Sequence, residues 1–198
     1  DYFLSSQHRV SSDKLILSFD DGPNNSTRTI LKVLKKHDVG AVFFLIGKNM
    51  ENEKELLNEL RNGGFVLGNH SYSHSSKFAL MSTKRIIAEL NKTERLLGQS
   101  SIRLFRPPFG ITSPQINRAV KHLGLKSIGW SLRSLDTLIN EKDQLVSKIL
   151  KKSKGGSIIL LHDKGKCTSS CLEEIILGLR LSGKSFASNE DIIRLLHG

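Results

Sequence analysis

Short apolar runs alternate with amphipathic helical patterns along almost the whole chain. Apolar runs bounded by turn residues are typical of buried strands, and apolar positions spaced three and four apart are typical of helices. The predicted strands are KLILSF (14–19), AVFFLI (41–46), FVLGN (65–69), IRLF (102–105), LKSIGW (125–130), SIILL (157–161) and KSFA (184–187). The predicted helices cover about residues 27–37, 51–62, 82–97, 114–124, 141–152, 171–181 and the segment after Ser188.

Two of these helices carry clear start signals. Ser113 before Pro114 is a capping residue followed by proline at the first helical position. Ser188, with Asp191 three residues later, resembles a capping box for the final helix. We therefore expect helices to begin at both serines.

The alternation of strands with helices predicts an α/β fold with a parallel sheet and helices packed outside it. Seven or eight such units can close into a barrel, and an open doubly wound sheet is the alternative. The 198 residues contain no linker, low-complexity tract or shorter internal repeat, so residues 1–198 are predicted to form a single domain with a core from about residue 14. The segment FDDGPNNST after the first strand is neither a P-loop nor a dinucleotide fingerprint.

Composition narrows the class of protein. The apolar share of 38% and charged share of 25% are typical of a globular protein. A formal charge of +11, from 30 basic and 19 acidic residues, favours partners such as nucleic acid, anionic membrane or acidic glycans. Because the lysines are scattered through amphipathic helices, and no RNA-recognition or helix-turn-helix signature is present, we expect solvated helix faces and no nucleic-acid partner.

The sequence shows neither a membrane span of roughly 18 to 20 apolar residues nor a signal-peptide pattern. The chain begins at Asp1 rather than Met, so a targeting segment could have preceded it. Cys167 and Cys171 are the only cysteines, and their four-residue spacing does not indicate a metal or redox motif. Two free thiols and one local disulfide remain alternatives.

Ionisable residues follow five of the predicted strands. Parallel α/β folds build their sites at the C-terminal ends of strands, so we expect these residues to converge on one rim. In chain order they are Asp20 and Asp21, His70 and His74, Arg106, Arg133 and Asp136, and His162 and Asp163.

The spacing His70-x-x-x-His74 lets both imidazoles reach one metal ion, although paired histidines are also common on polar surfaces. A carboxylate from Asp20 or Asp21 would complete three protein ligands and leave a position for water, the usual arrangement of catalytic zinc. The other aspartate could take a proton from that water, and the cation would relieve the repulsion between the two acids. Alone, the Asp pair would fit a polar turn or a helix cap.

His162 follows a very apolar strand and could act as general acid toward a leaving group, although a lone histidine there would also fit a core position. Arg106 could pair with the free aspartate, and its alternative is a surface ion pair. Pro107 and Pro108 would stiffen the next loop, so that a backbone N–H beyond them could help stabilise an oxyanion.

Four motifs occur together and in order along the chain: FDDGP, H-S-x-x-H, RPPFG and LLHD. With them, the chain resembles the polysaccharide deacetylases (the NodB-homology domain, carbohydrate esterase family 4) from about Leu15 to the C-terminal helix. The resemblance implies a distorted (β/α)7 barrel. It also implies a divalent metal, commonly zinc with cobalt as an alternative, used to hydrolyse acetyl groups from sugars.

The resemblance implies a metal site and a general base. Asp21, His70 and His74 would be the metal ligands. Asp20 would be the general base, and Arg106 would orient it and tune it.

The resemblance also implies how the substrate is held and the reaction completed. The backbone N–H of Phe109 would help to stabilise the oxyanion, and Leu160 would line the pocket for the acetyl methyl. His162 would protonate the leaving amine.

The fourth motif of many members, W-S-x-D-T-x-D-W, is altered here. Asp136 matches the second acid, which would support His162, whereas Arg133 replaces the first acid and Thr137 replaces the final tryptophan. The missing aromatic wall could loosen the acetyl pocket or open it to a different sugar. The extra cation could favour an anionic substrate or belong to a structural ion pair.

We therefore predict a metal-dependent deacetylase that releases acetate from N-acetylglucosamine-containing glycans such as chitin or peptidoglycan. The alternatives are an ester deacetylase acting on O-acetyl groups, as in acetyl xylan, and a glycan-binding domain with a weakened site. The basic charge and the family resemblance lead us to expect an exported protein, periplasmic, wall-facing or extracellular, associated with the cell wall or a membrane surface.

Overall fold

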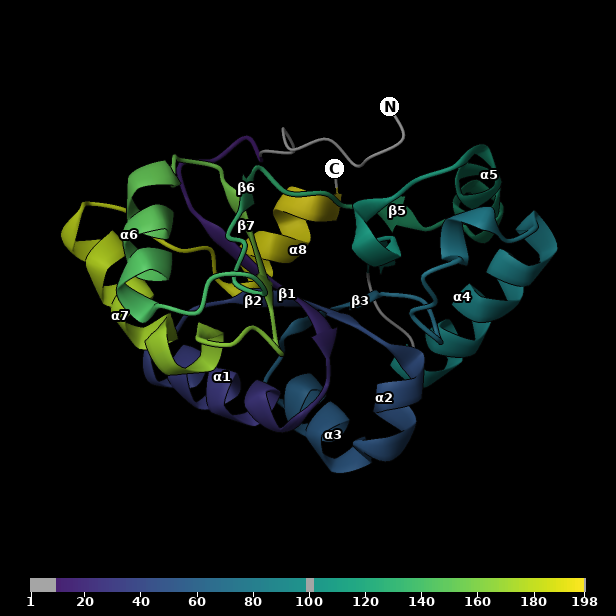
Figure 1. The fold of residues 1–198 in the computed structure, drawn as a ribbon, viewed down its shortest axis with the longest axis horizontal. Helices are drawn as coiled ribbons and strands as arrows, with labels where there is room; N and C mark the ends of the chain where they lie inside the picture. The colour runs from purple at the N-terminus through teal and green to yellow at the C-terminus, as the bar shows by residue number, and fades with distance from the viewer. Residues whose placement is uncertain (1–9, 99–101, 198) are drawn as a thin grey trace.

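The computed structural model describes residues 10–98 and 102–197, in which a curled parallel sheet is surrounded by helices (Figure 1). The strands are β1 (Ile16–Gly22), β2 (Ala41–Leu45), β3 (Val66–Asn69), β4 (Leu104–Phe105), β5 (Lys126–Ser127), β6 (Leu132–Arg133) and β7 (Ile158–His162). They pair in the order β5-β4-β3-β2-β1-β7-β6, and every pair is parallel.

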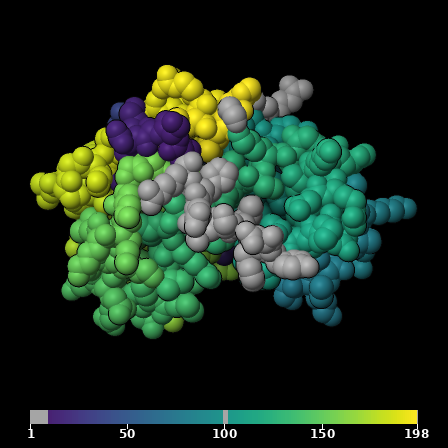
Figure 2. Space-filling view, turned by 90° about the horizontal axis from the view of Figure 1, so that it is seen from above, coloured from purple at the N-terminus to yellow at the C-terminus, as the bar shows by residue number. Residues whose placement is uncertain are grey.

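Most of the helices cover the outer face of this sheet, and the last one packs against the apolar residues of its inner face. The helices are α1 (Asn25–Lys36), α2 (Gly47–Asn52), α3 (Lys54–Asn62), α4 (Thr83–Leu97), α5 (Pro114–Leu123), α6 (Lys142–Lys152), α7 (Thr168–Leu181) and α8 (Asn189–His197). In Figure 1, α6 and α7 lie on the left, α4 and α5 on the right, and α1 to α3 along the lower edge. Figure 2 shows the same arrangement from above, with the green segment of α6 and the teal segment of α5 on opposite sides. None of the helices described is both long and apolar enough to cross a membrane.

Side chains alternate between the two faces of each strand and so build two apolar cores. Leu17 and Phe19 of β1 face outward and pack in a cluster with residues of α1, α3, α6 and α7. Ile16 faces inward, in a second cluster that includes residues of β2, β3, β4, β7 and α8. At the C-terminal edge the inner face of β1 ends on Asp20, whose register partner on β7 is His162. The apolar core inside the barrel therefore ends in polar groups at this edge.

The sheet curls into an incomplete barrel. β5 and β6 stand at the two ends of the strand order, and among the described residues no backbone ladder joins them. The predicted α/β fold with a distorted (β/α)7 barrel is confirmed.

The last strand predicted from the sequence, however, is not a strand of the sheet. The segment KSFA at 184–187 forms only one isolated bridge, between Phe186 and Leu15. The seventh strand is instead β6, in the stretch that the sequence indicated as a loop. A strand of two residues is too short to display the two-residue periodicity that identifies strands. The prediction at 184–187 was therefore wrong, although the number of strands was right.

The predicted helix at 51–62 is two helices, α2 and α3. Glu53 separates them because its backbone leaves the helical region, with φ −118° and ψ 49°. Both capping predictions are confirmed: Ser113 Oγ accepts from the N–H of Ile116 at 3.3 Å, and Ser188 Oγ accepts from the N–H of Asp191 at 3.1 Å. The two cysteines are buried free thiols, so of the two alternatives the disulfide is not formed.

Candidate active site

The end of β1 brings two consecutive aspartates to the same place. Regular alternation would turn Asp21 to the outer face, away from Asp20. Instead, the register of β1 against β2 shifts between Asp20 and Gly22, and Asp21 has a left-handed backbone with φ 78°. Such a bulge re-aims a side chain. Asn49 Nδ2 donates to the Asp21 carbonyl at 2.9 Å and holds the bulge in place.

His70 and His74 lie in the turn that follows β3. Asn69 Oδ1 accepts from the N–H of Ser71 at 2.9 Å, and Ser71 Oγ accepts from the N–H of His74 at 3.1 Å. His70 Nδ1 lies 2.8 Å from the carbonyl of Arg106. Because a carbonyl can only accept, Nδ1 carries the proton and donates, which leaves Nε2 of the neutral ring as a lone pair for a metal.

Asp21, His70 and His74 form a group among the described residues that could hold a metal ion, with ligand atoms within 4.8 Å of one another. Asp21 Oδ1 lies 3.1 Å from His74 Nε2, is buried, and has no hydrogen-bond partner. Such an orphaned carboxylate oxygen is costly unless a positive group reaches it. Burial, reinforced by nearby His70, lowers the pKa of His74 to about 4, so its ring is neutral at pH 7. One carboxylate and two imidazoles fit a divalent cation such as zinc.

Arg106 is a fully buried cation that contacts Asp20 from behind. Its Nη1 donates to Asp20 Oδ1 at 2.7 Å and to Ser18 Oγ at 3.0 Å. Nε and Nη2 donate to the carbonyls of Ile128 and Gly129, at 3.0 and 2.7 Å. The guanidinium is thus fixed by four partners, and it holds one oxygen of Asp20 while leaving Oδ2 available.

His162 and Asp136 form a second buried pair. Asp136 Oδ1 accepts from His162 Nδ1 at 2.8 Å, and Oδ2 accepts from the backbone N–H of His162 at 2.7 Å. Thr168 and Ser134 also donate to this carboxylate, at 2.6 and 3.0 Å. Burial lowers the pKa of His162, but the hydrogen bond to Asp136 and the nearby acids outweigh it, so the pKa of His162 is raised. Its Nε2 is the nitrogen left for other work.

Phe109 lies in a 3-10 turn, Pro108–Gly110, with a left-handed φ of 60°. The residue is 55% exposed, and the centroid of its ring lies 4.7 Å from that of the His74 ring. The next residue must be glycine: Gly110 has φ 71°, and a Cβ there would sit 2.4 Å from the Trp130 ring. Leu160 extends from the inner face of β7.

These elements surround one cavity of about 210 Å³ at the C-terminal edge of the sheet. It is lined by Asp20, Asp21, His70, His74, Phe109, Gly110, Trp130, Arg133, Thr137, Leu160, His162 and Lys164. Seven of the nine site residues predicted from the sequence are in this lining. The other two, Arg106 and Asp136, lie behind it in contact with Asp20 and His162.

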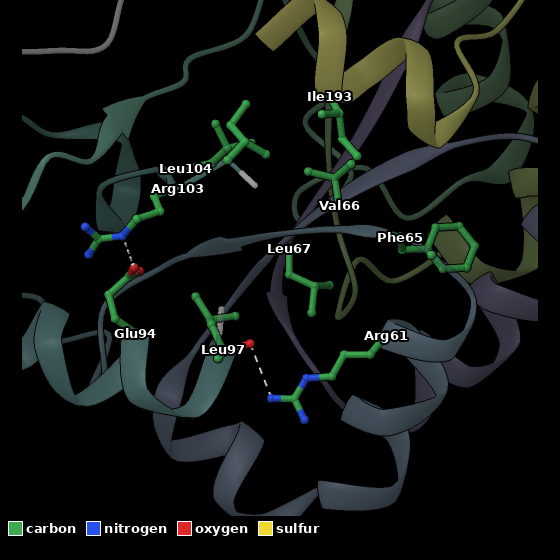
Figure 3. Close-up of a pocket in the computed structure, with 12 residues that line it drawn as sticks. Arg61, Phe65, Val66, Leu67, Glu94, Leu97, Arg103, Leu104 and Ile193 are labelled. Atoms are coloured by element: carbon green, nitrogen blue, oxygen red, sulfur yellow. Dashed lines mark hydrogen bonds and ion pairs between the residues drawn. The ribbon is translucent and has the colours of Figure 1, made fainter. Parts of the chain in front are cut away.

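A larger cavity, of about 310 Å³, lies at the opposite, N-terminal edge of β3 and β4 (Figure 3). Its charged groups are already paired: Arg103 Nε lies 3.0 Å from Glu94 Oε2, and Arg61 donates to the Leu97 carbonyl at 3.3 Å. Much of the remaining wall is apolar, and no histidine is in it. We therefore take the smaller cavity as the candidate active site.

Sequence reasoning missed Lys164, whose Nζ lies 3.0 Å from Asp21 Oδ2. Burial raises the pKa of Asp21, but His70, His74 and Lys164 together hold it well below its usual range. The sequence offers one indication of a role for Lys164, its position directly after the LLHD motif. Ser18 was also missed, because a serine inside an apolar strand gives no hint that it accepts from a buried arginine.

Asp163 directly follows β7 and is fully buried. Its Oδ2 accepts from the Thr27 hydroxyl, its Oδ1 has no hydrogen-bond partner, and its N–H donates to the Asp20 carbonyl at 3.0 Å. Burial, above all, raises the pKa of Asp163 to about 7. The residue therefore ties the N-terminus of α1 to the end of β1, which carries the two aspartates.

Replacing Asp163 by Asn should flatten the pH dependence of stability. The folded state holds the Asp163 proton more tightly than the unfolded state, so the free energy of unfolding falls as pH rises from 3.8 to about 7. At roughly 1.4 kcal/mol per pKa unit, the full cost above pH 7 is about 4 kcal/mol at most. Urea unfolding in chelator should show the variant matching the parent at pH 4 and exceeding it at pH 8. Parallel pH curves for parent and variant would contradict this, and the exposed Asp13→Asn serves as control.

The comparisons with known proteins point one way. The family model for polysaccharide deacetylases matches residues 7–128, more than half of the chain. The chain is 28% identical to the peptidoglycan-N-acetylmuramic acid deacetylase PdaA of Bacillus subtilis, over 90% of this chain and 71% of that protein. It is 33% identical to a peptidoglycan-N-acetylglucosamine deacetylase of Bacillus cereus, over 88% of this chain and 66% of that protein.

Among solved structures, a CE4 family pseudoenzyme from Bacillus anthracis is similar in fold, with a TM-score of 0.83 at 27% identity. The likeness covers 94% of this chain and 66% of that one. The sequence match and the shared fold agree, and the chain belongs to the polysaccharide deacetylase family.

Proposed function

We propose that this chain is a metal-dependent hydrolase that removes acetyl groups from the nitrogen of N-acetylglucosamine-containing glycans, chitin-like or peptidoglycan-like, and releases acetate. The names of its relatives, deacetylases of peptidoglycan N-acetylglucosamine and N-acetylmuramic acid, support a glycan substrate. One observation carries the proposal: a single cavity combines the candidate metal group with a further carboxylate, Asp20, and a further imidazole, His162.

We assign Asp20 as the general base. Arg106 holds Oδ1 at 2.7 Å, and Oδ2 lies 3.7 Å from Nε2 of His70, one of the candidate ligands. A divalent cation held by Asp21, His70 and His74, which we infer to be zinc with cobalt as the alternative, would supply positive charge that acidifies water and polarises the acyl oxygen. Asp20 then accepts the proton of the attacking water.

We assign His162 as the general acid. With Nδ1 tied to Asp136, Nε2 delivers a proton to the leaving nitrogen as the carbon–nitrogen bond breaks. The oxygen of the attacking water stays on the acyl carbon, and acetate leaves. The backbone N–H of Phe109 donates to the developing oxyanion, and Leu160 packs against the acetyl methyl.

Replacing Asp136 by Asn should move the pH profile of the reaction. The Asp136 charge helps to raise the pKa of His162, so losing it lowers that pKa. A proton donor must be protonated, so the alkaline limb of kcat/KM should shift to lower pH, and activity at pH 7 should fall by about 10- to 100-fold. Acetate release measured from pH 5 to 10 tests this. An unchanged alkaline limb would contradict the claim that Asp136 raises the pKa of His162.

A rival within the enzymes is an ester deacetylase that acts on O-acetyl groups such as those of acetyl xylan. Acetate release from chitin oligomers and from acetylated xylan, each with and without chelator, separates the two. The proposal expects chelator-sensitive release from the chitin oligomers. Release from the xylan alone would favour the ester deacetylase.

A second rival is a glycan-binding domain with a weakened site. It is favoured by the altered motif at Arg133 and Thr137 and by the existence of a pseudoenzyme of similar fold. It predicts glycan binding without acetate release even with added zinc or cobalt.

The net charge of +11 supports our further proposal that the protein is exported and works at the cell wall or a membrane surface.

A further inference from the structure

The two carboxylate oxygens of Asp21 have different surroundings. Oδ1 lies 3.1 Å from Nε2 of His74 and 3.5 Å from Nε2 of His70, and it has no hydrogen-bond partner among the described residues. Oδ2 lies 3.0 Å from Nζ of Lys164. One oxygen is therefore directed at the two imidazoles that could bind a metal ion, and the other is occupied by a cation of the protein itself.

The backbone on both sides of Lys164 is fixed in place. The N–H of Asp163 donates to the carbonyl of Asp20 at 3.0 Å. Gly165 packs so closely against Asp136 that a Cβ at this position would collide with the Asp136 carboxylate. The turn that carries Lys164 is therefore anchored to the end of β1 on one side and to the buried partner of the general acid on the other.

The ion pair of Lys164 with Asp21 joins an exposed group to a buried one. The Lys164 side chain is 59% exposed, whereas that of Asp21 is 5% exposed. An ion pair with so exposed a partner contributes little to the stability of a fold. The ammonium is nevertheless a charged donor, which binds a carboxylate oxygen more strongly than a neutral donor does. The contact therefore matters more for the orientation of the Asp21 carboxylate than for folding.

We propose that Lys164 is a positioning residue of the metal site, which holds Oδ2 of Asp21 so that this carboxylate offers a divalent cation one oxygen, Oδ1, instead of two. This inference rests on the proposed function, because it takes the metal ligands from it. A carboxylate can bind a cation through one oxygen or through both. With Oδ1 and one nitrogen from each histidine, the chain supplies three ligand atoms and leaves a position for water, as catalytic zinc sites do. A second oxygen from Asp21 would compete for that position.

Lys164→Met tests this proposal through metal binding, because methionine keeps an unbranched side chain but loses the cation and the donor. The affinity for Zn²⁺, measured by competition with a chromophoric chelator, should rise by about 10-fold or more, since a positive charge beside a ligand is removed and Oδ2 becomes available. When the protein is loaded with Co²⁺, the visible absorption bands should weaken, because a higher coordination number lowers their intensity. In acetate-release assays with added zinc, kcat should fall by about 10-fold, because water loses its position.

Two further variants serve as controls. Lys164→Arg keeps a cationic donor and should retain the zinc affinity and the cobalt spectrum of the parent. Lys166→Met removes the same charge from an exposed position farther along the same segment and should change neither. Unchanged or weaker zinc binding by Lys164→Met would overturn the proposal. Tighter binding with an unchanged cobalt spectrum would overturn it too, by reducing the role of Lys164 to its charge.

The two metal-binding measurements do not depend on turnover. If the parent binds zinc but releases no acetate from any glycan, the proposed function fails, and the zinc affinity and cobalt spectrum of Lys164→Met still decide on Lys164. If the parent binds no zinc, the role of Lys164 is refuted whatever the acetate release.

Discussion

Asp20→Asn is expected to abolish turnover, lowering kcat by about 10³-fold or more, while the protein keeps its metal. The amide cannot accept the proton of the attacking water. It can still accept the hydrogen bond of Arg106 Nη1, which lies 2.7 Å from Oδ1 in the parent. Acetate release and elemental analysis of the same purified sample measure both consequences.

Unfolding of the variant would also abolish turnover, so its stability must be measured separately. Arg106 is fully buried, and removing the charge of its carboxylate partner leaves a buried cation without compensation, which is destabilising. Thermal unfolding of the variant therefore accompanies the assay. A folded, metal-containing and inactive variant supports Asp20 as the base, whereas a folded variant with full activity would remove it from that role.

Replacing His70 and His74 together by Ala is expected to eliminate metal binding. Their rings supply two of the three ligand groups that lie within 4.8 Å of one another, and Asp21 alone cannot hold a divalent cation in competition with water. Zinc content after dialysis should fall from one ion per chain to a trace, and acetate release should fall with it.

His122→Ala is the matched control for this experiment. His122 is exposed in the last turn of α5, and its loss should leave both metal content and activity unchanged. Stoichiometric zinc in the double variant would refute the assignment of ligands. It would require another set of donors.

The parts of the fold and the site that depend on long apolar segments could be predicted from the sequence. β1, β2 and β7 contain long apolar runs, interrupted only by Ser18, so the ends of these runs, and the polar residues that follow, could be placed. Parallel pairing then predicts one rim for Asp20, His70 and His162.

Other features depend on tertiary structure and leave no local pattern. β6 has two residues, too few to show the periodicity of a strand in the sequence. The left-handed bulge at Asp21 arises from a register shift against β2, which single-sequence periodicity does not encode. The ion pair of Lys164 with Asp21 joins segments far apart in the chain. The bulge and the ion pair alter the site rather than the fold, whereas the position of β6 concerns both.

The structure shows where the residues of the altered fourth motif lie. Asp136 keeps the contact with His162 that the family resemblance implied, at 2.8 Å from Nδ1. Arg133 is left at the cavity wall without a protein partner among the described residues, and Thr137 lines the same wall in place of a tryptophan. The change therefore affects the part of the cavity that would face the sugar, and leaves Asp20 and His162 in place.

The most direct test of the central claim is acetate release from an acetylated glycan panel by the purified protein, before and after metal removal. The panel contains chitin oligomers, peptide-free peptidoglycan strands and acetylated xylan. We predict release from the N-acetylated glycans that stops in chelator and returns when zinc is added back. Release that persists unchanged in a sample shown by elemental analysis to be metal-free, or no release from any N-acetylated glycan with zinc present, would contradict it.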